Sequence, residues 1–416
     1  MGTPVDTGTL DVPAPDFGLD DQPDIHRVFA DLRDRRDFAV VPYAGQNAVV
    51  LLTHDLVTAA FKDAETFPAS AIYPHTTGPV LGHTIQCMDG VEHRRNRSII
   101  APKFRRSRIT EYVSAILEPV AVELVDEFAD RGHADLVVEF TERYPVRVIC
   151  RLLGLPDRDE DRLFAWAQHL FTYPMDPEAA KTASRELTEF VLPLLAERRT
   201  DPGDDLLSEL AAATSDDPEL GPFALTDEEV LAFVRLLFPA GVDTTMLGTG
   251  NILSALLQHP EQLGLLREDL EGRALGAVWE GLRYEPPVGI LPRICPEATT
   301  WRGLDLAAGT LVVFAVTAAN RDPRQWPEPD RFDITREDTA TISFGQGAHS
   351  CLGNWLALAE MEAALVALVG RLPNLRLRPG AEALAGAAPT SRVGTALRGP
   401  VSLEVEWDLQ PEAYRR

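Results

Sequence analysis

A glycine-rich segment, Phe344–Gly353, contains the residues of this chain that are best suited to chemistry. Its glycines allow backbone amides to approach Cys351, and a helical apolar pattern follows from Asn354 to about Leu368. A cysteine at a helix N-terminus is stabilised as a thiolate by free N–H groups and by the helix dipole. Such a thiolate is a suitable axial ligand for haem iron. A buried structural cysteine beside a turn is the alternative interpretation.

A long apolar helix is predicted from Thr226 to about Gln258. Thr226 and Glu229 form a capping box, in which each side chain bonds the backbone N–H of the other. The helix would be roughly 50 Å long, at about 1.5 Å per residue. Residues 230–238 are apolar on almost every side, which predicts that this helix runs through the core.

The middle of this helix carries Pro239 and Gly241, followed by Asp243 and Thr244. Proline removes an intrahelical hydrogen bond, and a threonine hydroxyl competes for backbone carbonyls. We therefore expect a break or kink beside an acid and a hydroxyl, which is costly unless a ligand occupies it. The alternative is a kinked core helix in which the threonine hydroxyl already has a hydrogen-bond partner and no ligand binds.

The residues present exclude other kinds of binding site for this glycine-rich segment. A dinucleotide-binding G-x-G-x-x-G would need glycine where Ser350 stands, and no lysine follows a glycine as a Walker loop requires. No H-E-x-x-H occurs, and His349 with Cys351 supplies too few ligands for zinc.

The Cys351 segment resembles the haem-binding loop of the cytochrome P450 family, whose pattern is F-x-x-G-x-x-x-C-x-G. The matching residues are Phe344, Gly347, Cys351 and Gly353. Three further family motifs follow the family's order along the chain: A-G-x-[DE]-T-[ST] at Ala240–Thr245, E-x-x-R at Glu280–Arg283, and a P-x-R-F-like segment at Pro329–Phe332. Weaker similarity extends from about residue 25 to the C-terminus.

The resemblance implies haem b as cofactor and assigns roles residue by residue. Cys351 would be the axial ligand, Thr244 and Asp243 would handle protons, and Phe344 and Gly353 would belong to the cofactor loop. The haem propionates would be held by His93, Arg97, Arg293 and His349. Glu280, Arg283 and Arg331 would form a buried structural ion network. Ordinary surface charge is the alternative for His93 and Arg97, and a solvated surface pair is the alternative for Glu280 and Arg283.

The resemblance also places a mostly apolar substrate pocket, without a fixed charge to anchor an acid or an amine. Its predicted lining residues are Ile72, Tyr73, Val80, Phe171, Leu237, Ala240, Val288, Ile290 and Leu291. Each of them could equally belong to the ordinary core. A hydrophobic small molecule of terpenoid, steroid, fatty-acyl or aromatic type is expected.

No flavin or nicotinamide segment is visible, so electrons must come from a partner. Residues 91–108 contain seven arginine or lysine side chains between Arg94 and Arg108, and Glu92 is their only acid. We therefore expect a ferredoxin-type protein to dock near Arg94–Arg108. A solvated helix face is the alternative. The predicted reaction inserts one atom of O2 into the substrate. A cytochrome P450 that couples, desaturates or uses peroxide, and a haem sensor without turnover, are the rival functions.

Composition limits the class of protein. The chain has 416 residues with 39 basic and 64 acidic side chains, a formal charge of −25. This acidic balance argues against nucleic-acid binding and against binding to anionic membranes. The four cysteines never form C-x-x-C, and neither a signal peptide nor an apolar run of membrane-spanning length is visible. These features predict a cytoplasmic protein without a membrane anchor.

The elements that must position these residues predict a mainly α fold with small β-sheets. Residues 1–24 are expected to be a flexible segment, and 25–416 a single domain of the cytochrome P450 fold. We expect a helix over Ile25–Arg35, a β-hairpin from Phe38–Tyr43 and Ala48–Thr53, and a long irregular loop over 67–90. The haem would lie between the kinked central helix and the helix after Cys351.

Overall fold

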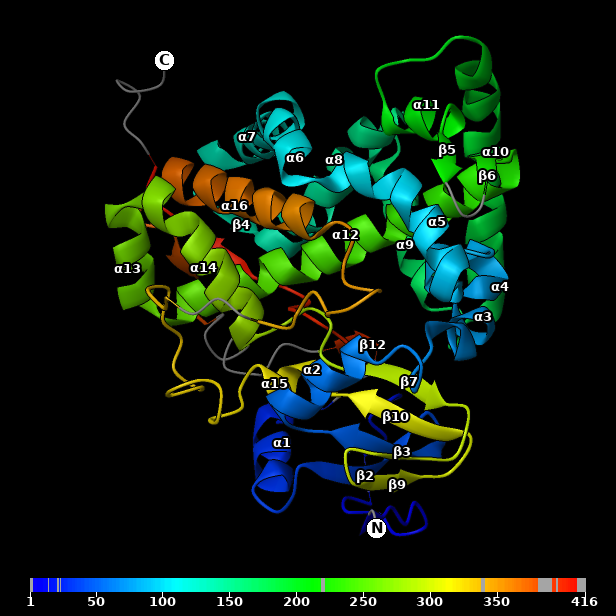
Figure 1. The fold of residues 1–416 in the computed structure, drawn as a ribbon. Coiled ribbons are helices and arrows are strands. Elements are labelled where there is room, and N and C mark those ends of the chain that lie inside the picture. The colour runs from blue at the N-terminus through cyan, green and yellow to red at the C-terminus, as the bar shows by residue number, and fades with distance from the viewer. Residues whose placement is uncertain are drawn as a thin grey trace.

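A computed structural model describes residues 3–13, 15–20, 22, 24–217, 221–337, 341–380, 391–393 and 396–409. The fold is mainly helical with several small sheets, as predicted (Figure 1). The longer helices are α1 (Ile25–Arg33), α2 (His54–Lys62), α5 (Gly90–Ile100), α6 (Arg106–Tyr112), α7 (Glu118–Asp126), α8 (Arg143–Leu153), α9 (Glu160–Phe171), α10 (Pro177–Thr200), α11 (Leu206–Ala211), α12 (Asp227–Gln258), α13 (Pro260–Glu268), α14 (Leu270–Tyr284) and α16 (Asn354–Arg371). The shorter ones are α3 (Tyr73–Thr76), α4 (Gly78–Leu81), α15 (Val316–Ala319), η1 (Ala69–Ala71), η2 (Ile85–Cys87), η3 (Ala101–Phe104), η4 (Val113–Leu117), η5 (Ala129–Arg131) and η6 (Val137–Thr141).

The largest sheet has four strands and lies at one end of the molecule, beside α1 and α2 (Figure 1). Its order is β2 (Phe38–Tyr43), β3 (Gln46–Leu51), β10 (Thr310–Phe314) and β7 (Leu291–Cys295). The β3–β10 pair is parallel, and the other two pairs are antiparallel. The smaller sheets are β1 (Thr3–Pro4) with β9 (Leu304–Leu306) and β8 (Thr299–Trp301), β11 (Arg376–Leu377) with β14 (Glu404–Glu406) and β4 (His133–Asp135), β12 (Ser391–Val393) with β13 (Leu397–Arg398), and β5 (Thr214–Asp217) with β6 (Gly221–Ala224).

The predicted hairpin is present, with a turn tighter than expected. Tyr43 pairs with Gln46, so only Ala44 and Gly45 form the turn. Their φ values are 51° and 77°, and two successive positive φ angles match the two-residue turn that suits twisted antiparallel strands. The Asp16 carboxylate accepts hydrogen bonds from both turn amides, at 2.7 and 2.8 Å, and so holds this turn in place.

The described part of 1–24 packs against the rest of the protein and does not form the separate flexible segment that we expected. β1 pairs with β9. Phe17 is fully buried, and its ring stacks on that of Phe29 with 5.7 Å between centroids. Burial of the aromatic pair removes apolar surface from water, and the Asp16 contacts satisfy backbone donors. Both hold these residues on the sheet.

The 67–90 region is also more ordered than predicted, because it contains η1, α3, α4 and η2 instead of an irregular loop. Pro74 and Pro79 lie in the first turns of α3 and α4. A proline there costs no hydrogen bond, since the first N–H groups of a helix have no partner within the helix. These prolines therefore lie at the starts of short helices.

Helix α12 crosses the middle of the molecule (Figure 1) and begins at the predicted capping box. The Thr226 N–H donates to Glu229 at 2.8 Å, and the Glu229 N–H donates to the Thr226 hydroxyl at 3.3 Å. The helix is continuous through Pro239, so the expected break is absent. The Thr244 hydroxyl donates to the Ala240 carbonyl at 2.8 Å, which is the local competition for carbonyls that threonine was expected to offer.

Helix α12 is also long and apolar enough to cross a membrane, with a mean hydropathy of 1.5 over its most apolar window, although no such run was expected. Within the protein 83% of that window is buried. The helix packs against α8, α9, α14 and α16, so its apolar surface is covered by other helices. Its hydrophobicity is that of a core helix, as the sequence predicted.

Candidate functional site

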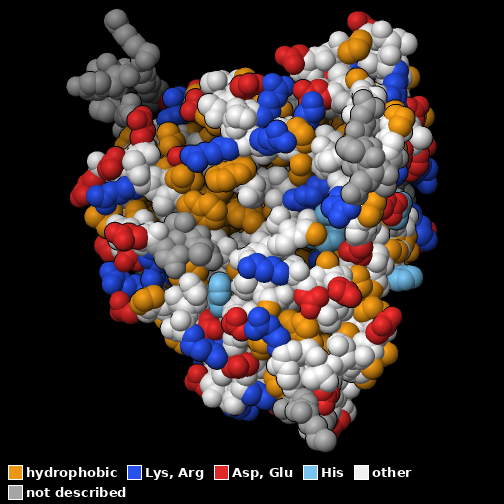
Figure 2. Space-filling view, viewed as in Figure 1, with side chains coloured by type: hydrophobic (Ala, Val, Ile, Leu, Met, Phe, Trp, Pro, Cys, Tyr) orange, Lys and Arg blue, Asp and Glu red, His pale blue; other side chains and the backbone are white. Residues whose placement is uncertain are grey.

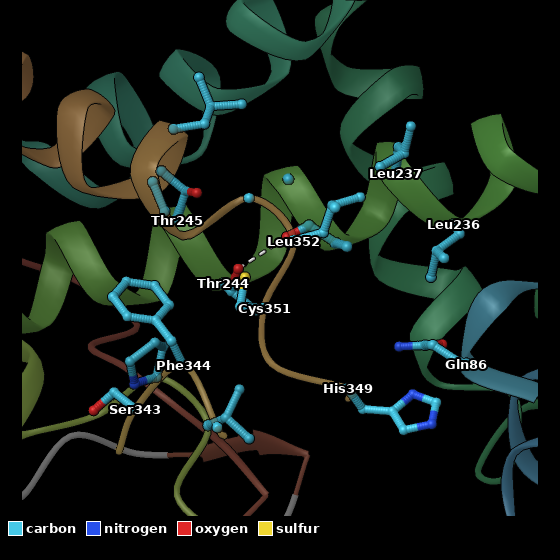
Figure 3. Close-up of a pocket in the computed structure, with 18 of the residues that line it drawn as sticks. Gln86, Leu236, Leu237, Thr244, Thr245, Ser343, Phe344, His349, Cys351 and Leu352 are labelled. Atoms are coloured by element: carbon cyan, nitrogen blue, oxygen red, sulfur yellow. Dashed lines mark hydrogen bonds between the residues drawn. The ribbon is translucent and has the colours of Figure 1, made fainter. Parts of the chain in front are cut away.

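A cavity of about 300 Å³ lies between α12 and the loop that precedes α16. Leu237, Ala240 and Thr244 of α12 line one side, and Cys351 and Leu352 of the loop line another. Figure 3 shows this loop passing across α12 with Cys351 and Thr244 near the centre of the view. The cavity therefore brings together the cysteine and the threonine that the sequence singled out, although they are more than a hundred positions apart.

The Cys351 loop is shaped by glycine and by one backbone contact. Gly345 and Gly347 have φ values of 63° and 75°, and a Cβ on Gly347 would lie 2.6 Å from the Phe61 carbonyl oxygen. Only glycine fits that position without moving the backbone. The Cys351 N–H donates to the Phe344 carbonyl at 2.8 Å, which closes the loop. Helix α16 then begins three residues after Cys351, as predicted.

The Cys351 thiol is exposed toward this cavity, whereas Cys87, Cys150 and Cys295 are buried. Removal of the Cys351 thiol from bulk water raises its pKa, and the Gly353 N–H and the Arg97 guanidinium oppose that shift. The helix N-terminus therefore does not by itself make Cys351 a thiolate. A metal cation in the cavity would do so, because a coordinated thiol loses its proton.

Two histidines lie side by side at the edge of the cavity. The ring centroids of His93 and His349 are 4.2 Å apart, and His93 is buried with no hydrogen-bond partner for its Nε2 within the described structure. Burial, His349 and Arg97 lower the pKa of His93 to about 4. His349 Nε2 contacts the Asp89 carboxylate at 3.0 Å. The orphaned His93 nitrogen is a donor that an anionic group in the cavity would satisfy.

Two arginines reach the same cavity without a carboxylate partner among the described residues. Arg97 donates to the Ser350 carbonyl at 2.7 Å. Arg293 is buried, and it donates to the Tyr73 hydroxyl at 3.2 Å and to the Pro292 carbonyl at 2.9 Å. Buried cations are costly unless they are paired. These arginines and the two histidines together fit a cofactor that carries carboxylates, as haem does.

The loop also leaves room for a flat cofactor. A Cβ built on Gly353 meets no atom within 4 Å, and Gly353 lines the cavity. Phe344 lines it too, and its ring packs edge-on against Trp279 with 5.9 Å between centroids. The thiol, the unpaired cations and this open space therefore suit iron protoporphyrin.

The Asp243–Thr244 pair is divided between the cavity and the protein interior. Thr244 lines the cavity. Asp243 is only 3% exposed and does not line it, and instead its carboxylate accepts a hydrogen bond from the Gln168 amide of α9. The acid thus faces a neighbouring helix, whereas the hydroxyl faces the cavity.

Comparison with known proteins decides the family. The family model for cytochrome P450 matches residues 164–373. The chain is 35% identical to 6-deoxyerythronolide B hydroxylase of Saccharopolyspora erythraea over 85% of this chain and 90% of that one. The chain belongs to the cytochrome P450 family. Like other members it binds haem b and is a monooxygenase, which confirms the predicted family, cofactor and class of enzyme.

Two further comparisons agree with this cytochrome P450 assignment. The chain is 38% identical to a vitamin D(3) 25-hydroxylase of Pseudonocardia autotrophica over 75% of each chain. In structure it resembles PksS, the cytochrome P450 of the Bacillus subtilis 168 bacillaene polyketide synthase, with a TM-score of 0.83 and 27% identity over 93% of this chain and 97% of that one. The predicted fold class is thereby confirmed.

The buried ion network of this cytochrome P450 differs from the expected one in one arginine. Arg283 contacts the Glu280 carboxylate at 2.7 and 2.8 Å, and both side chains are 2% exposed. Arg336 supplies the third charge, with Nε 3.2 Å from Glu280. The predicted Arg331 side chain is 57% exposed and pairs with Glu328 and Asp333, so that assignment is wrong. Arg331 contributes its backbone carbonyl to Arg283 and Arg336.

The cavity of this cytochrome P450 includes only some of the predicted substrate residues. Those that line it are Tyr73, Leu237, Ala240, Val288 and Leu291. Ile72, Val80 and Ile290 are buried in the hydrophobic core, and Phe171 packs against that core without lining the cavity. Those four assignments therefore fail for the cavity described, because position in a segment does not fix the direction of a side chain.

Other lining residues were missed by the sequence reasoning. Gln86 lies within the 67–90 region, and Leu236 directly precedes the predicted lining residue Leu237, so a wider choice would have included them. Ile149 of α8 carries no sequence signal that separates it from other core residues. Glu360 of α16 is buried with an unpartnered Oε2, and burial raises its pKa well above the ordinary value of 4.5. Burial thus disfavours the ionised form of this acid, which lines the cavity.

The basic segment Arg94–Arg108 is partly neutralised on the surface of this cytochrome P450. Lys103 and Arg108 both pair with Glu209, at 2.7 and 3.0 Å. Arg105 and Arg106 remain exposed, and the Arg106 guanidinium lies 5.2 Å from the ring centroid of Trp355, near the start of α16. Figure 2 shows Lys and Arg side chains beside a group of hydrophobic side chains over α6 and α16.

Proposed function

We propose that this cytochrome P450 hydroxylates a neutral, largely hydrophobic molecule of polyketide or steroid type, with Cys351 as the haem ligand and a ferredoxin as electron donor. The observation that carries this proposal is the convergence on one cavity of the Cys351 thiol, the unpaired guanidinium groups of Arg97 and Arg293, and the orphaned His93 nitrogen. No other set of described side chains in the chain offers a thiol together with several unpaired cations around one space.

Haem bound through a thiolate supplies the activation of dioxygen that the side chains of a protein cannot provide. The residues of the chain would hold it in place. Arg97 and Arg293 would hold the propionates by charge-assisted hydrogen bonds, and His93 would add a hydrogen bond. His349, already in contact with Asp89, would order the same edge. Cys351 would be fixed toward the iron by the loop that Gly345 and Gly347 shape.

Thr244 and Asp243 would move the protons that the reaction consumes. The Thr244 hydroxyl can turn from the Ala240 carbonyl, now 2.8 Å away, to hold a proton within the cavity. The Asp243 carboxylate faces α9, where Gln168 donates a hydrogen bond to it. From that side of α12, Asp243 can pass a proton toward Thr244. The mostly apolar lining excludes bulk water, so proton delivery depends on these two residues.

The substrate class follows from the lining and from the relatives. Leu236, Leu237, Val288 and Leu291 present apolar side chains to the cavity. Relatives are named for hydroxylating 6-deoxyerythronolide B and vitamin D(3), and both are neutral molecules with large hydrocarbon parts. Burial of such a skeleton against these side chains would supply binding free energy in proportion to its apolar area.

The electron donor would dock on the exposed arginines of Arg94–Arg108. Arg105 and Arg106 face solvent, and the Arg106 guanidinium lies near Trp355 in the first turn of α16, the helix that follows the Cys351 loop. A ferredoxin is acidic, so it would be attracted to these arginines, although the formal net charge of the whole protein is −25. The cytoplasmic location predicted from the sequence stays a prediction, and it suits a soluble donor of this kind.

The test is turnover with isotopically labelled dioxygen. Compounds of polyketide and steroid type are first screened for the spin-state shift that follows displacement of water from haem iron. Binders are then incubated with ferredoxin, ferredoxin reductase and a nicotinamide reductant under labelled O2, with catalase present. We expect a product that carries one labelled oxygen atom. A product without label, or turnover that catalase abolishes, would contradict the proposal.

A further inference from the structure

Gln86, in η2, offers an unsatisfied amide to the cavity. Its Oε1 is buried and has no hydrogen-bond partner within the described structure. Figure 3 shows the side chain extending into the cavity on the same side as Leu236. A buried amide oxygen without a partner is destabilising, and native proteins seldom leave one unless a ligand satisfies it.

The surroundings of Gln86 cannot satisfy this amide. Ile85 precedes it, and Leu236 and Leu237 of α12 line the same cavity with hydrocarbon. Two hydroxyls that line the cavity already have partners: the Tyr73 hydroxyl accepts from Arg293, and the Thr244 hydroxyl donates to Ala240. Figure 3 shows Thr245 at the opposite side of the view from Gln86. Gln86 is therefore a polar group in an apolar part of the lining.

We propose that the Gln86 amide hydrogen-bonds an oxygen atom of the substrate and selects neutral molecules that carry a hydroxyl or carbonyl group. This inference rests on the proposed function and adds a specificity-determining residue to it. An amide both donates and accepts, so it suits a hydroxyl or a carbonyl and gives no preference to a full charge. A substrate without such an oxygen would leave the buried amide unpaired and would bind less tightly.

The charges around the cavity support a neutral ligand. Arg97, Arg293, His93 and His349 are the groups assigned to the haem propionates. Glu360 is the acid among the lining residues, and burial raises its pKa well above 4.5, which disfavours the anion that an amine would pair with. Neither an acid nor an amine therefore gains an ion pair near Gln86, whereas an uncharged oxygen gains a hydrogen bond.

The experiment compares two steroid probes that differ in oxygen content. Testosterone carries a hydroxyl and a ketone, and 5α-androstane is the corresponding hydrocarbon skeleton. Dissociation constants are measured from the spin-state shift of the ferric holoenzyme for the wild type, for Gln86→Met and for Leu236→Met. Methionine keeps the length of glutamine without its hydrogen bonds, and Leu236→Met is the matched change at a neighbouring lining residue.

The wild type should prefer testosterone over androstane by about tenfold, and Gln86→Met should lose most of this preference while Leu236→Met retains it. An equal preference in wild type and Gln86→Met, or no response of the wild type to either steroid, would overturn the proposal. A second readout excludes a role in holding haem: haem content and the carbon monoxide spectrum of Gln86→Met should equal those of the wild type. Loss of haem in this variant would assign the amide to a propionate and overturn the inference.

These outcomes are separable from failure of the proposed function. If the wild-type protein lacks the thiolate haem spectrum, the proposed function fails before any steroid is added. If that spectrum is present and the Gln86→Met substitution leaves the testosterone preference unchanged, the monooxygenase proposal stands and only the role of Gln86 is wrong.

Discussion

The Gln168 amide of α9 donates a hydrogen bond to the Asp243 carboxylate, which directs that acid away from the cavity lined by its neighbour Thr244. Two consecutive residues of α12 thus face different environments. The hydroxyl is available to a ligand, and the acid is held behind it against another helix. Under the proposed function, Thr244 would hold a proton at the site, and Asp243 would resupply it.

Thr244→Ala should uncouple electron consumption from product formation. The variant keeps haem and substrate binding but cannot hold a proton where oxygen is activated, so reductant is spent on hydrogen peroxide. We expect the product formed per reductant consumed to fall about tenfold or more. The measurement is the ratio of product to reductant with peroxide assayed in parallel. Full coupling in this variant would rule out the role of Thr244.

Asp243→Asn should slow turnover more than it uncouples it. The asparagine can still contact Gln168 but cannot release a proton, so we expect the rate to fall about a hundredfold with an increased solvent isotope effect. Gln168→Leu leaves the acid in place and should cost less, about threefold to tenfold. An unchanged rate and isotope effect in Asp243→Asn would show that protons reach the site by another route.

Reversing the charges of Arg105 and Arg106 together, by Arg105→Glu and Arg106→Glu, should weaken the interaction with ferredoxin. We expect the ferredoxin-dependent kcat/KM to fall about tenfold at low ionic strength, with the difference shrinking as salt is added. The matched control is Arg27→Glu with Arg185→Glu, exposed arginines that are 73% and 62% accessible on α1 and α10 and change the net charge equally. If kcat/KM fell equally in both double variants, the assignment of Arg105 and Arg106 to the ferredoxin docking surface would be wrong.

Arg336→Gln should destabilise the protein, whereas Arg331→Gln should not. Arg336 lies 3.2 Å from the buried Glu280 carboxylate, and its loss leaves that charge with Arg283 alone. We expect a decrease of about 1–3 kcal/mol in the free energy of unfolding. The Arg331 side chain is 57% exposed, and its backbone contacts survive the substitution. Denaturant unfolding of the holoenzyme measures both, and equal stability of the two variants would contradict this network.

The sequence predicted those features that depend on local spacing. The capping box at Thr226, the hairpin at Phe38–Tyr43, the Glu280–Arg283 pair and the start of α16 after Cys351 all follow from patterns within a few residues. Such patterns act through contacts that the backbone geometry brings together whatever the rest of the fold does.

Features that depend on side-chain direction or on tertiary contacts could not be predicted. Arg336, and not Arg331, contacts Glu280. The sequence could not show this, because the stretch has no regular periodicity that would indicate which arginine turns toward Glu280. Ile72 and Val80 enter the core because the short helices of 67–90 direct them there. The lack of a partner for the Gln86 oxygen depends on tertiary contacts, so no sequence pattern could show it.

The central claim is that Cys351 holds haem iron as a thiolate, and one spectrum tests it most directly. The protein is expressed with haem, reduced with dithionite and exposed to carbon monoxide, alongside the Cys351→Ala variant. The account predicts an absorption band at about 450 nm in the wild type and its loss in Cys351→Ala. Absence of the band in the wild type, or its retention in Cys351→Ala, would contradict the assignment.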